Sequence, residues 1–397
     1  MFKRNHHFIK KNKIKIHRRS DNLKLKVAEL FAGIGAWSKA LEKLDIDHEV
    51  VEAIEFDEKT IHSYNLIHNT DFKSKDITLI NPNEFPDHDL LFYSPPCQAF
   101  SVAGKQEGFD DTKGRGTLFF EAVKVIQAKK PKYAIMENVK GLTQKKFMFE
   151  FETMLQLLEQ EGYKNYWKVL NAKDYGIPQN RERVFIISIR NDVQKEFKFP
   201  QPLIGDLLLK DFLQKEVDDK YYLSKEKTMA LLEEYKKGLI KKGKLPSELS
   251  LNGESISYCI DANYAKGISP GSVNDGRRTH IVEVLPCITP DRINKRQNGR
   301  RFKEDGEPSF TINTQDRHGV LIIKEHIYKI RRLTPLECIR LMGFNDEDYG
   351  KLKEGNISDS LIYKMAGNSI VVNVIEEIIK ELIPEYLNSK NTYKQMK

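Results

Sequence analysis

Residues 25–44, LKVAELFAGIGAWSKALEKL, contain a complete strand–turn–helix unit. Residues 25–31 form a short apolar stretch typical of a buried strand, and residues 36–44 carry apolar side chains at helical spacing. Between them, Gly33 and Gly35 permit a tight turn whose backbone can approach a ligand closely beside a helix N-terminus. The segment therefore predicts the start of an α/β fold with a ligand site at the turn.

The same alternation of strands and helices continues toward the C-terminus, up to about residue 190. The pattern predicts strands at residues 48–56, 89–94, 132–139, 166–172 and 183–190, and helices at residues 57–69, 117–130 and 147–162. Such a series favours a doubly wound, mostly parallel sheet covered by helices on both faces.

The rhythm changes after residue 190, so we expect four parts in the chain. Residues 1–24 form a basic arm that we expect to be flexible, and residues 25–190 form the first domain. Residues 191–328 are rich in Lys, Gly, Asn and Asp, which predicts a second, smaller and irregular domain. Regular patterning returns over residues 329–397, which we expect to complete the first domain.

Short elements are predicted within the two C-terminal parts. Residues 310–314 and 319–324 have strand-like sequences. Thr334, with Glu337 three residues on, predicts a capped helix, and residues 368–382 predict a last helix whose apolar face docks on the core.

Composition excludes several classes of protein. The chain has 397 residues, 40% of them hydrophobic and 31% charged, as in an ordinary globular protein. It has no apolar run long enough to cross a bilayer and no secretory signal, so we expect a cytoplasmic protein. The net charge of +8 favours an anionic partner.

Cysteine and histidine usage gives no sign of a metal site. The four cysteines include no CxxC pair, which argues against structural zinc and against a disulfide framework. His62, His68, His280 and His318 form no ligand pattern, and we expect them at surface or packing positions. No metal is therefore expected.

Glu55 lies about 20 positions beyond the glycine turn, where an acidic residue can bind ribose hydroxyls. Phe56 could stack on an adenine face, and Asp76 and Ile77 could meet its edge. Ser38 stands in place of the third glycine of the dinucleotide pattern, so the turn by itself is weak evidence. We favour an adenosine-type ligand over a tight turn that binds nothing.

Cys97, in SPPCQAFS (94–101), follows the end of the strand predicted at 89–94, where doubly wound sheets bind ligands. An inert buried cysteine is the alternative. The glycine-rich and charged stretch 98–117 behind it could close over a substrate. A thiol presented for chemistry is our interpretation.

Polar side chains also stand at the end of one further strand and at the start of another. Glu137 and Asn138 close the apolar stretch 132–139, where a carboxylate is costly unless it has a partner or a role. Arg181 and Arg183 lie two residues apart and so point to the same side of a strand.

Together these groups suggest methylation of cytosine at carbon 5. A thiolate that adds to carbon 6 turns the ring into an enamine, whose carbon 5 can attack a sulfonium methyl group. A carboxyl group at N3 and an arginine at O2 stabilise the adduct. The base must leave the duplex stack to meet them.

The chain strongly resembles the C5 DNA cytosine methyltransferases of bacterial restriction–modification systems over about residues 25–190 and 327–385. The matching motifs occur in order: FAGIG (31–35), AIEFD (53–57), SPPCQAFS (94–101), ENV (137–139), QNRERVF (179–185), RRLTPLECIRLMGF (331–344) and AGNSIVV (366–372). One departure is Tyr93–Ser94 before the two prolines, where the family often has glycine.

The resemblance implies a Rossmann-like, S-adenosylmethionine-dependent methyltransferase fold and a role for each matching residue. It implies Cys97 as nucleophile, Glu137 at N3, Asn138 as support for its loop, Arg183 at the base and Arg181 as an orienting group. It implies that the methyl donor, S-adenosylmethionine, is lined by Phe31, Gly33, Gly35, Glu55, Phe56, Asp76, Ile77, Pro96, Asn368 and Ser369. Arg331 or Arg332 and Thr334 would support the recognition domain.

By the same resemblance, residues 191–328 form the target recognition domain for double-stranded DNA. Arginine suits guanine, and Asn or Gln suits adenine, although a phosphate contact is the more frequent role of any one such residue. The expected DNA-binding residues are Gln98 and Ser101 on the mobile loop, with Arg296, Arg300, Thr311, Gln315 and Arg317 in the recognition domain.

Three alternatives stay open at this point. An RNA cytosine methyltransferase of the same fold would share most motifs, although the large basic recognition region favours duplex DNA. A silent DNA-binding regulator should lack Cys97 or Glu137, and both are present. A nicotinamide oxidoreductase fits the glycine turn poorly. We expect a monomer, with a cognate restriction endonuclease as a conceivable partner and no membrane association.

Overall fold

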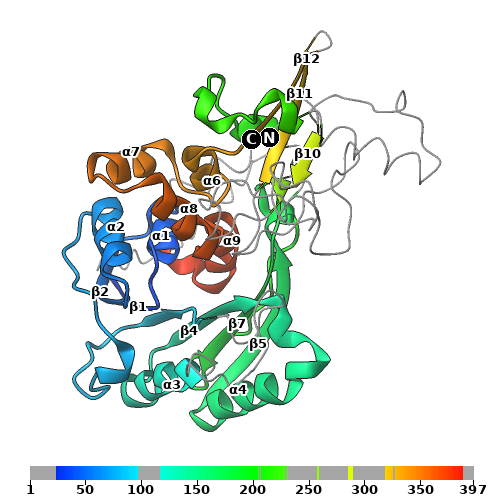
Figure 1. Cartoon of the computed structure of the whole chain (residues 1–397). Helices are drawn as coiled ribbons and strands as arrows, with labels where there is room; N and C mark the ends of the chain where they lie inside the picture. Colours follow the sequence, from blue (N-terminus) through cyan, green and yellow to red (C-terminus); the bar gives the residue numbers. More distant parts are fainter. Residues whose placement is uncertain are drawn as a thin grey trace, which may run out of the picture.

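The computed structural model describes residues 24–96, 117–203, 205, 207–228, 230 and 330–387, and in addition the backbone of the strand residues 257–258, 285–288, 318–324 and 327–329 (Figure 1). Its centre is a six-stranded sheet in the order β2-β1-β3-β4-β7-β5. The strands are β1 (Leu25–Leu30), β2 (His48–Ile54), β3 (Leu90–Tyr93), β4 (Tyr133–Val139), β5 (Tyr163–Asn171) and β7 (Glu182–Arg190).

The sheet is mostly parallel, as predicted. β2, β1, β3 and β4 pair in parallel, whereas β7 runs antiparallel to both β4 and β5. The physical reason lies in the connection between Asn171 and Glu182, which contains no α-helix to carry the chain back for a parallel pairing. The last predicted strand is therefore the reversed one.

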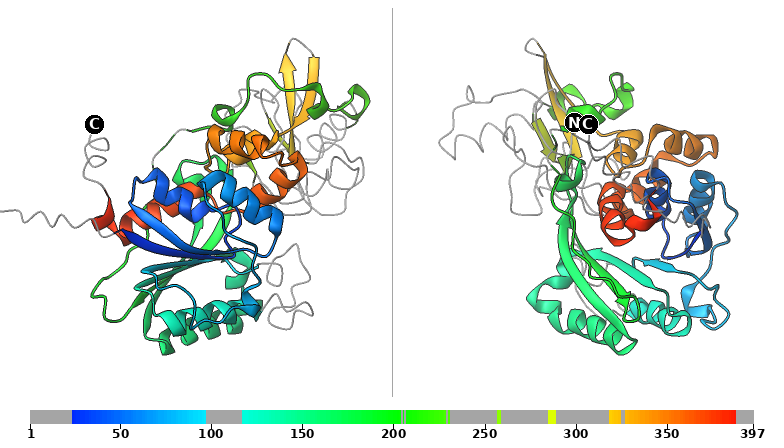
Figure 2. Two further views of the ribbon diagram at one scale, coloured as in Figure 1. Left: turned by 90° about the vertical axis from the view of Figure 1, so that its left-hand side faces the viewer. Right: turned by 180° about the vertical axis from the view of Figure 1, so that it is seen from behind.

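Helices cover both faces of the sheet, which confirms the doubly wound architecture (Figures 1 and 2). One face packs on α3 (Leu118–Lys129) and α4 (Met148–Gln160). The other packs on α1 (Ala36–Lys43) and α9 (Val372–Leu382), with α2 (Glu58–His68) beside them. The apolar side chains of the strands alternate between these two cores, so the central strands are buried on both sides.

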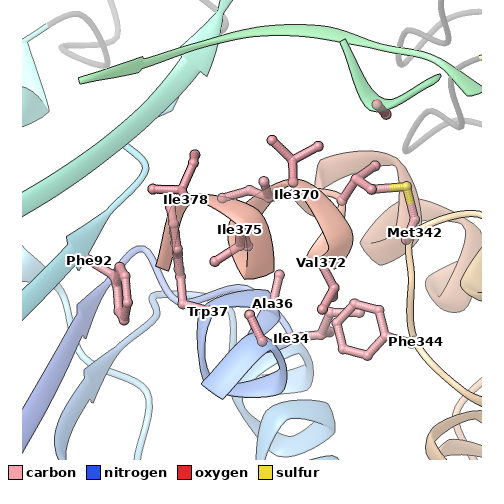
Figure 3. Close-up of a cluster of buried hydrophobic side chains, with 14 of the residues drawn as sticks. Ile34, Ala36, Trp37, Phe92, Met342, Phe344, Ile370, Val372, Ile375 and Ile378 are labelled. Carbon is pink, nitrogen blue, oxygen red and sulfur yellow. The ribbon is translucent and has the colours of Figure 1, made fainter. Parts of the chain in front are cut away.

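The core between the sheet, α1 and α9 joins N-terminal and C-terminal parts of the sequence (Figure 3). Trp37 of α1 stacks on Phe92 of β3 with ring centroids 4.5 Å apart. Val372 and Ile375 of α9 are buried in the same cluster. The apolar face of the last helix thus docks on the core as predicted, and the C-terminal segment completes the layer that the strand–turn–helix unit begins.

The last predicted helix begins later than expected. Residues 368–382 were assigned to one helix, but α9 starts at Val372, and Asn368 is the last residue of a separate helix, α8 (Asp359–Asn368). The extended backbone of Ser369, with ψ at 166°, ends α8 and separates the two helices. The break places Ser369–Val371 in a connection that faces the sheet.

The return segment contains two more helices before this break. α6 (Pro335–Arg340) begins at Thr334, whose side chain accepts a hydrogen bond from Glu337 N while Glu337 caps Thr334 N, so the predicted capping box is confirmed. α7 (Asp346–Glu354) and α8 were not predicted. α7 has a capping box of its own at Asn345 and Asp348.

A separate three-stranded antiparallel sheet, β10-β11-β12, lies away from the main sheet (Figure 1). Its strands are β10 (Leu285–Ile288), β11 (His318–Lys324) and β12 (Ile327–Arg332). β11 confirms the strand predicted at 319–324, whereas residues 310–314 lie outside the described residues. β6 (Gln179–Asn180) pairs in parallel with β8 (Ser257–Tyr258). Within the described ranges, no helix is both long and apolar enough to cross a bilayer.

Candidate active site

The chain turns to opposite sides of the sheet between β1 and β3, and ligands of doubly wound sheets bind at the carboxyl ends of strands at such a point. The turn after β1 contributes Phe31, Gly33 and Gly35, all with left-handed backbone (φ of 59°, 59° and 77°). Left-handed backbone is unusual for a residue as large as phenylalanine, so the turn is held in place by its surroundings. This is where the sequence placed the ligand turn.

Glu55 fastens the glycine turn to the end of β2. Its Oε2 accepts a hydrogen bond from the Gly33 amide at 3.0 Å, and its Oε1 accepts one from the Asp57 amide at 3.0 Å. Burial raises the pKa of Glu55, and these two amide hydrogen bonds oppose the rise. Phe56 projects outward beside it with 74% of its surface exposed. An exposed aromatic ring next to a held carboxylate suits a purine nucleoside.

The segment after α2 returns to the same place. Lys75 N donates to Glu55 O at 2.9 Å, which sets Asp76 beside the end of β2. The Asp76 carboxylate caps a short 3-10 turn, Ile77–Leu79, by accepting from Thr78 N at 2.9 Å. The Ile77 side chain is buried in the core on the α3 side of the sheet, so its backbone is the part left for a ligand.

Glu137 and Arg183 form an ion pair on neighbouring strands, β4 and β7. Arg183 Nε lies 3.1 Å from Glu137 Oε1, and both side chains are largely buried. Burial raises the pKa of Glu137, while the charges of Arg183 and Arg181 oppose the rise. The carboxyl group thus holds a proton more readily than an exposed glutamate does.

Asn138 connects the end of β4 to the segment that precedes Cys97. Its Nδ2 donates to Pro95 O at 3.1 Å, and its Oδ1 accepts from Val139 N at 2.9 Å. The two motifs SPPC and ENV are therefore adjacent up to Pro96, which is half-buried. Cys97 itself lies outside the described residues.

Arg181 ties the C-terminal segment to this edge of the sheet. Its Nη2 donates to the carbonyl oxygens of Gly367 at 3.0 Å and Ser369 at 2.5 Å. Ser369 is buried, whereas Asn368 is exposed at the end of α8. The structure thus brings the predicted return residues next to the strand that carries Arg183.

A second buried arginine organises the start of the return segment. Arg331 makes two parallel hydrogen bonds to the Glu337 carboxylate, at 2.8 and 2.9 Å, and both side chains are buried. Glu337 also accepts from Gln214 N at 2.9 Å, which connects α6 to the beginning of the region 191–328. Arg331 and Thr334 therefore contact the segment through which the region 191–328 begins, by way of Glu337 and Gln214.

Several predicted site residues, like Cys97, lie outside the described residues. They are Gln98, Ser101, Arg296, Arg300, Thr311, Gln315 and Arg317. In the described part of the chain, no three His, Cys, Asp or Glu side chains come together in a way that could hold a metal ion.

A buried polar cluster behind the glycine turn was missed by the sequence reasoning. Glu29, the last residue but one of β1, is fully buried and accepts a hydrogen bond from Ser38 Oγ. Tyr64 OH lies 3.1 Å from Ser38 Oγ, and the His68 ring packs on the Tyr64 ring at 4.6 Å. One feature of the sequence could have indicated this cluster: Glu29 lies in a mostly apolar strand, and a buried carboxylate needs hydrogen-bond partners.

Comparison with known proteins decides the family. The model of the C-5 cytosine-specific DNA methylases matches residues 25–384, which include every motif described above. The chain belongs to this family. As a C-5 cytosine-specific DNA methylase it is an enzyme, and the activity expected from its motifs is confirmed at this level.

Relatives of this methylase include phage and bacterial proteins. The orphan methyltransferase M.SPRI of Bacillus phage SPR is 36% identical, with 93% of this chain and 99% of the relative covered. The type II methyltransferase M.HhaI of Haemophilus parahaemolyticus is 32% identical, with 89% and 93% covered.

Solved structures show the same fold. The Dnmt2 methyltransferase of S. pombe aligns with a TM-score of 0.61 at 21% identity, covering 91% of this methylase and 99% of that chain. A putative DNA modification methyltransferase encoded within an E. coli prophage aligns with a TM-score of 0.55 at 19% identity, covering 91% and 99%. The predicted methyltransferase fold class is confirmed.

Proposed function

We propose that this methylase transfers a methyl group from S-adenosylmethionine to carbon 5 of a cytosine flipped out of duplex DNA, through a covalent bond between Cys97 Sγ and carbon 6. The observation that supports this most is the adjacency of two strand ends. Glu137 and Arg183 pair at 3.1 Å, and Asn138 holds Pro95, two residues before Cys97, at 3.1 Å. A thiol, a carboxyl group and a guanidinium would then meet around one base.

The residues at the carboxyl ends of β1 and β2 support a site for the methyl donor. The carboxylate of Glu55 is oriented by two backbone amides, Phe56 offers an exposed ring, and the glycine turn leaves room for close approach at Gly33. We propose that these residues, with Phe31, Gly35, Asp76, Ile77, Pro96, Asn368 and Ser369, line the cofactor. S-adenosylmethionine supplies an electrophilic methyl group on a sulfonium and leaves as S-adenosylhomocysteine.

The protein groups divide the remaining work. The Cys97 thiolate adds to carbon 6 and makes carbon 5 nucleophilic. After methyl transfer, a water molecule takes the proton from carbon 5, and the thiolate is expelled from carbon 6. Glu137 donates a hydrogen bond to N3, a role that its raised pKa supports because the donor must be protonated. Arg183 holds the base at O2, and Arg181 and Asn138 keep the surrounding segments in place.

We further propose that residues 191–328 form the target recognition domain and that residues 25–190 and 329–397 form the catalytic domain. Two observations support a separate recognition domain. The sheet β10-β11-β12 is separate from the main sheet, and Glu337 of α6 bonds to both Arg331 and Gln214 where the two parts meet. Gln98 and Ser101 would contact DNA from the loop after Cys97. Residues 1–24 would be a flexible basic arm.

The biological setting forms part of the same proposal. The relatives include both type II methyltransferases such as M.HhaI and orphan methyltransferases such as M.SPRI. The type II relatives support a restriction–modification role with a cognate endonuclease acting on the same site. One recognition domain can read a short site alone, so we propose a monomer, working in the cytoplasm where bacterial and phage DNA is found.

The experiment is transfer of radioactive methyl groups from S-adenosylmethionine to unmethylated bacterial DNA, with the wild type and Cys97→Ser compared. We expect incorporation by the wild type and none by C97S, while C97S still binds S-adenosylhomocysteine in calorimetry. Transfer by C97S at the wild-type rate would refute the covalent mechanism. Loss of S-adenosylhomocysteine binding in both proteins would refute the cofactor assignment.

A further inference from the structure

The glycine turn is held from behind by a histidine on a different element. His68, the last residue of α2, has a side chain that is only 3% exposed. Its Nε2 lies 3.1 Å from the carbonyl oxygen of Ile34, between the two glycines, and its Nδ1 lies 2.6 Å from Glu42 Oε1 on α1. The ring therefore bridges the turn and the helix that follows it.

Both partners of the ring are acceptors. A backbone carbonyl has no proton to donate, and the pKa of Glu42 falls to about 2, because contacts with His68 and Lys39 outweigh the effect of its burial. The contact with Ile34 O is therefore a hydrogen bond when Nε2 carries the hydrogen. This Nε2–H is the donor that reaches the turn.

Charged groups from every neighbouring element surround this ring. Lys39 of α1 pairs with Glu42 at 2.6 Å and with Asp348 of α7 at 2.7 Å. Glu29 of β1 and His48 of β2 interact with His68 electrostatically. The Glu42 carboxylate is the group in direct contact, so it orients the ring toward Ile34.

Packing makes the turn depend on this ring. A Cβ atom added at Gly35 would collide with His68 and would lie 2.7 Å from Tyr64 Cε2. Gly35 is the N-cap of α1 and has no side-chain cap. The position of the turn is therefore set by the rings behind it as well as by Glu55 in front.

We propose that His68 is a positioning residue for the methyl donor: by donating from Nε2 to Ile34 O, it fixes the Gly33–Gly35 turn in the conformation that receives the cofactor. This inference rests on the proposed cofactor site. His68 acts through the backbone of the turn, at Ile34 O, so its effect should appear in cofactor affinity rather than in turnover at saturation.

Two amide substitutions separate the two hydrogen bonds. The amide of glutamine can reach the place of Nε2 and donate to Ile34 O, whereas the shorter asparagine reaches only the place of Nδ1 and donates to Glu42. We expect His68→Asn to weaken S-adenosylhomocysteine binding about tenfold, the loss of roughly one hydrogen bond. We expect His68→Gln to stay within about threefold of the wild type by the same conversion.

The readouts are the Kd for S-adenosylhomocysteine from calorimetry, kcat at saturating S-adenosylmethionine, and Tm. His88→Ala is the matched control, because His88 is a buried histidine whose Nδ1 also meets a backbone carbonyl, Pro86 O at 2.8 Å, just before β3 and away from the turn. We expect H88A to lower Tm without changing Kd, and H68N to change Kd with kcat at saturation nearly unchanged.

Equal weakening in H68Q and H68N, or a Kd that simply follows Tm across all variants, would overturn the proposal. If H68N does not fold, the Kd of Glu42→Gln tests the proposal instead, because this variant removes the carboxylate that orients the His68 ring. An increase in Kd of about threefold in E42Q is expected, and an unchanged Kd would overturn the role of His68. Absence of binding by the wild type would instead refute the proposed cofactor site.

Discussion

Glu29 lies near the C-terminal end of β1 with none of its surface exposed, and its Oε2 atom has no hydrogen-bond partner. Burial raises the pKa of Glu29 to about 7, although Ser38 and Tyr64 oppose the rise. The folded chain therefore keeps a proton that the unfolded chain releases above pH 4.5. The contribution to stability from this group is present below that pH and is lost as the pH rises through about 7.

Glu29→Gln removes this titration while keeping the shape of the side chain. We expect the unfolding free energy of E29Q, relative to the wild type, to rise by about 3 kcal/mol between pH 5 and pH 8. Urea denaturation at several pH values measures this difference, and Glu49→Gln on the exposed side of β2 is the control. A difference that stays constant with pH would contradict a buried, protonated Glu29.

The two glycines of the turn differ in what surrounds them. Gly33 has open space where a Cβ atom would go, so Gly33→Ala should cost about 1 kcal/mol of stability for its left-handed backbone alone. Gly35→Ala must also displace the rings of His68 and Tyr64 and should cost about 3 kcal/mol or more. Urea denaturation compares them, and equal losses would show that the rings yield freely.

Among single residues, the sequence predicted those proposed to contact the base and the cofactor better than those that hold them in position. Glu55, Glu137, Arg181 and Arg183 could be named because they belong to motifs at the ends of β2 and β4 and at the start of the reversed strand β7. His68 was expected at a surface or packing position, since its partners, Ile34 and Glu42, are 34 and 26 residues away. Contacts of that range depend on how α2 packs against α1, which local patterns do not specify.

Among the elements, the connection between α8 and α9 is the one that Arg181 ties to the start of β7, next to Arg183. Arg181, beside β7, donates to Gly367 O and Ser369 O there and is only 3% exposed. Arg181→Leu keeps apolar volume but leaves buried carbonyl groups without a donor. We expect a loss of about 2–4 kcal/mol in unfolding free energy and weaker S-adenosylhomocysteine binding.

Denaturation and calorimetry on R181L test this expectation. Lys164→Ala is the control. Lys164 lies on the edge strand β5 and makes an exposed ion pair with Glu196, so its removal should change the free energy of unfolding little. Wild-type stability in R181L would mean that the α8–α9 connection is held by its own helices alone.

The predictability of the elements follows the strength of their local patterns. The strands of the main sheet and α1 to α4 have clear periodicity and were predicted within a few residues. The separate helices α7 and α8 were not, because α7 is short and mostly polar and α8 runs into a segment that looked continuous with α9. The reversal of β7 needed the position of its partners as well as its own sequence.

On the scale of the whole molecule, the return segment and the first half of the chain form one body. Lys39 pairs with Asp348 at 2.7 Å, Lys351 donates to Ile67 O at 3.0 Å, and Lys364 pairs with Asp57 at 3.1 Å. These contacts join α7 and α8 to α1 and α2 independently of residues 191–328. Residues 191–228 also contact this body, through Phe197 and Leu209 in the core and through Tyr221 OH, which donates to Asp359 at 3.0 Å. We therefore expect the cofactor side to keep its own contacts when the proposed recognition domain is exchanged.

Replacing residues 191–328 with the corresponding segment of M.HhaI tests that division. We expect the chimera to methylate the target sequence of the donor enzyme with S-adenosylhomocysteine affinity unchanged. Calorimetry and sequencing of methylated DNA measure the two properties. A chimera that keeps the original target would contradict the assignment of residues 191–328 to recognition.

The central claim is methylation of cytosine in a defined DNA sequence, and bisulfite sequencing tests it most directly. Unmethylated DNA is incubated with S-adenosylmethionine and either the wild type or C97S, then converted and sequenced. We predict protected cytosines in one short sequence context with the wild type and none with C97S. No protected cytosine with a wild-type protein that binds S-adenosylhomocysteine would contradict the claim.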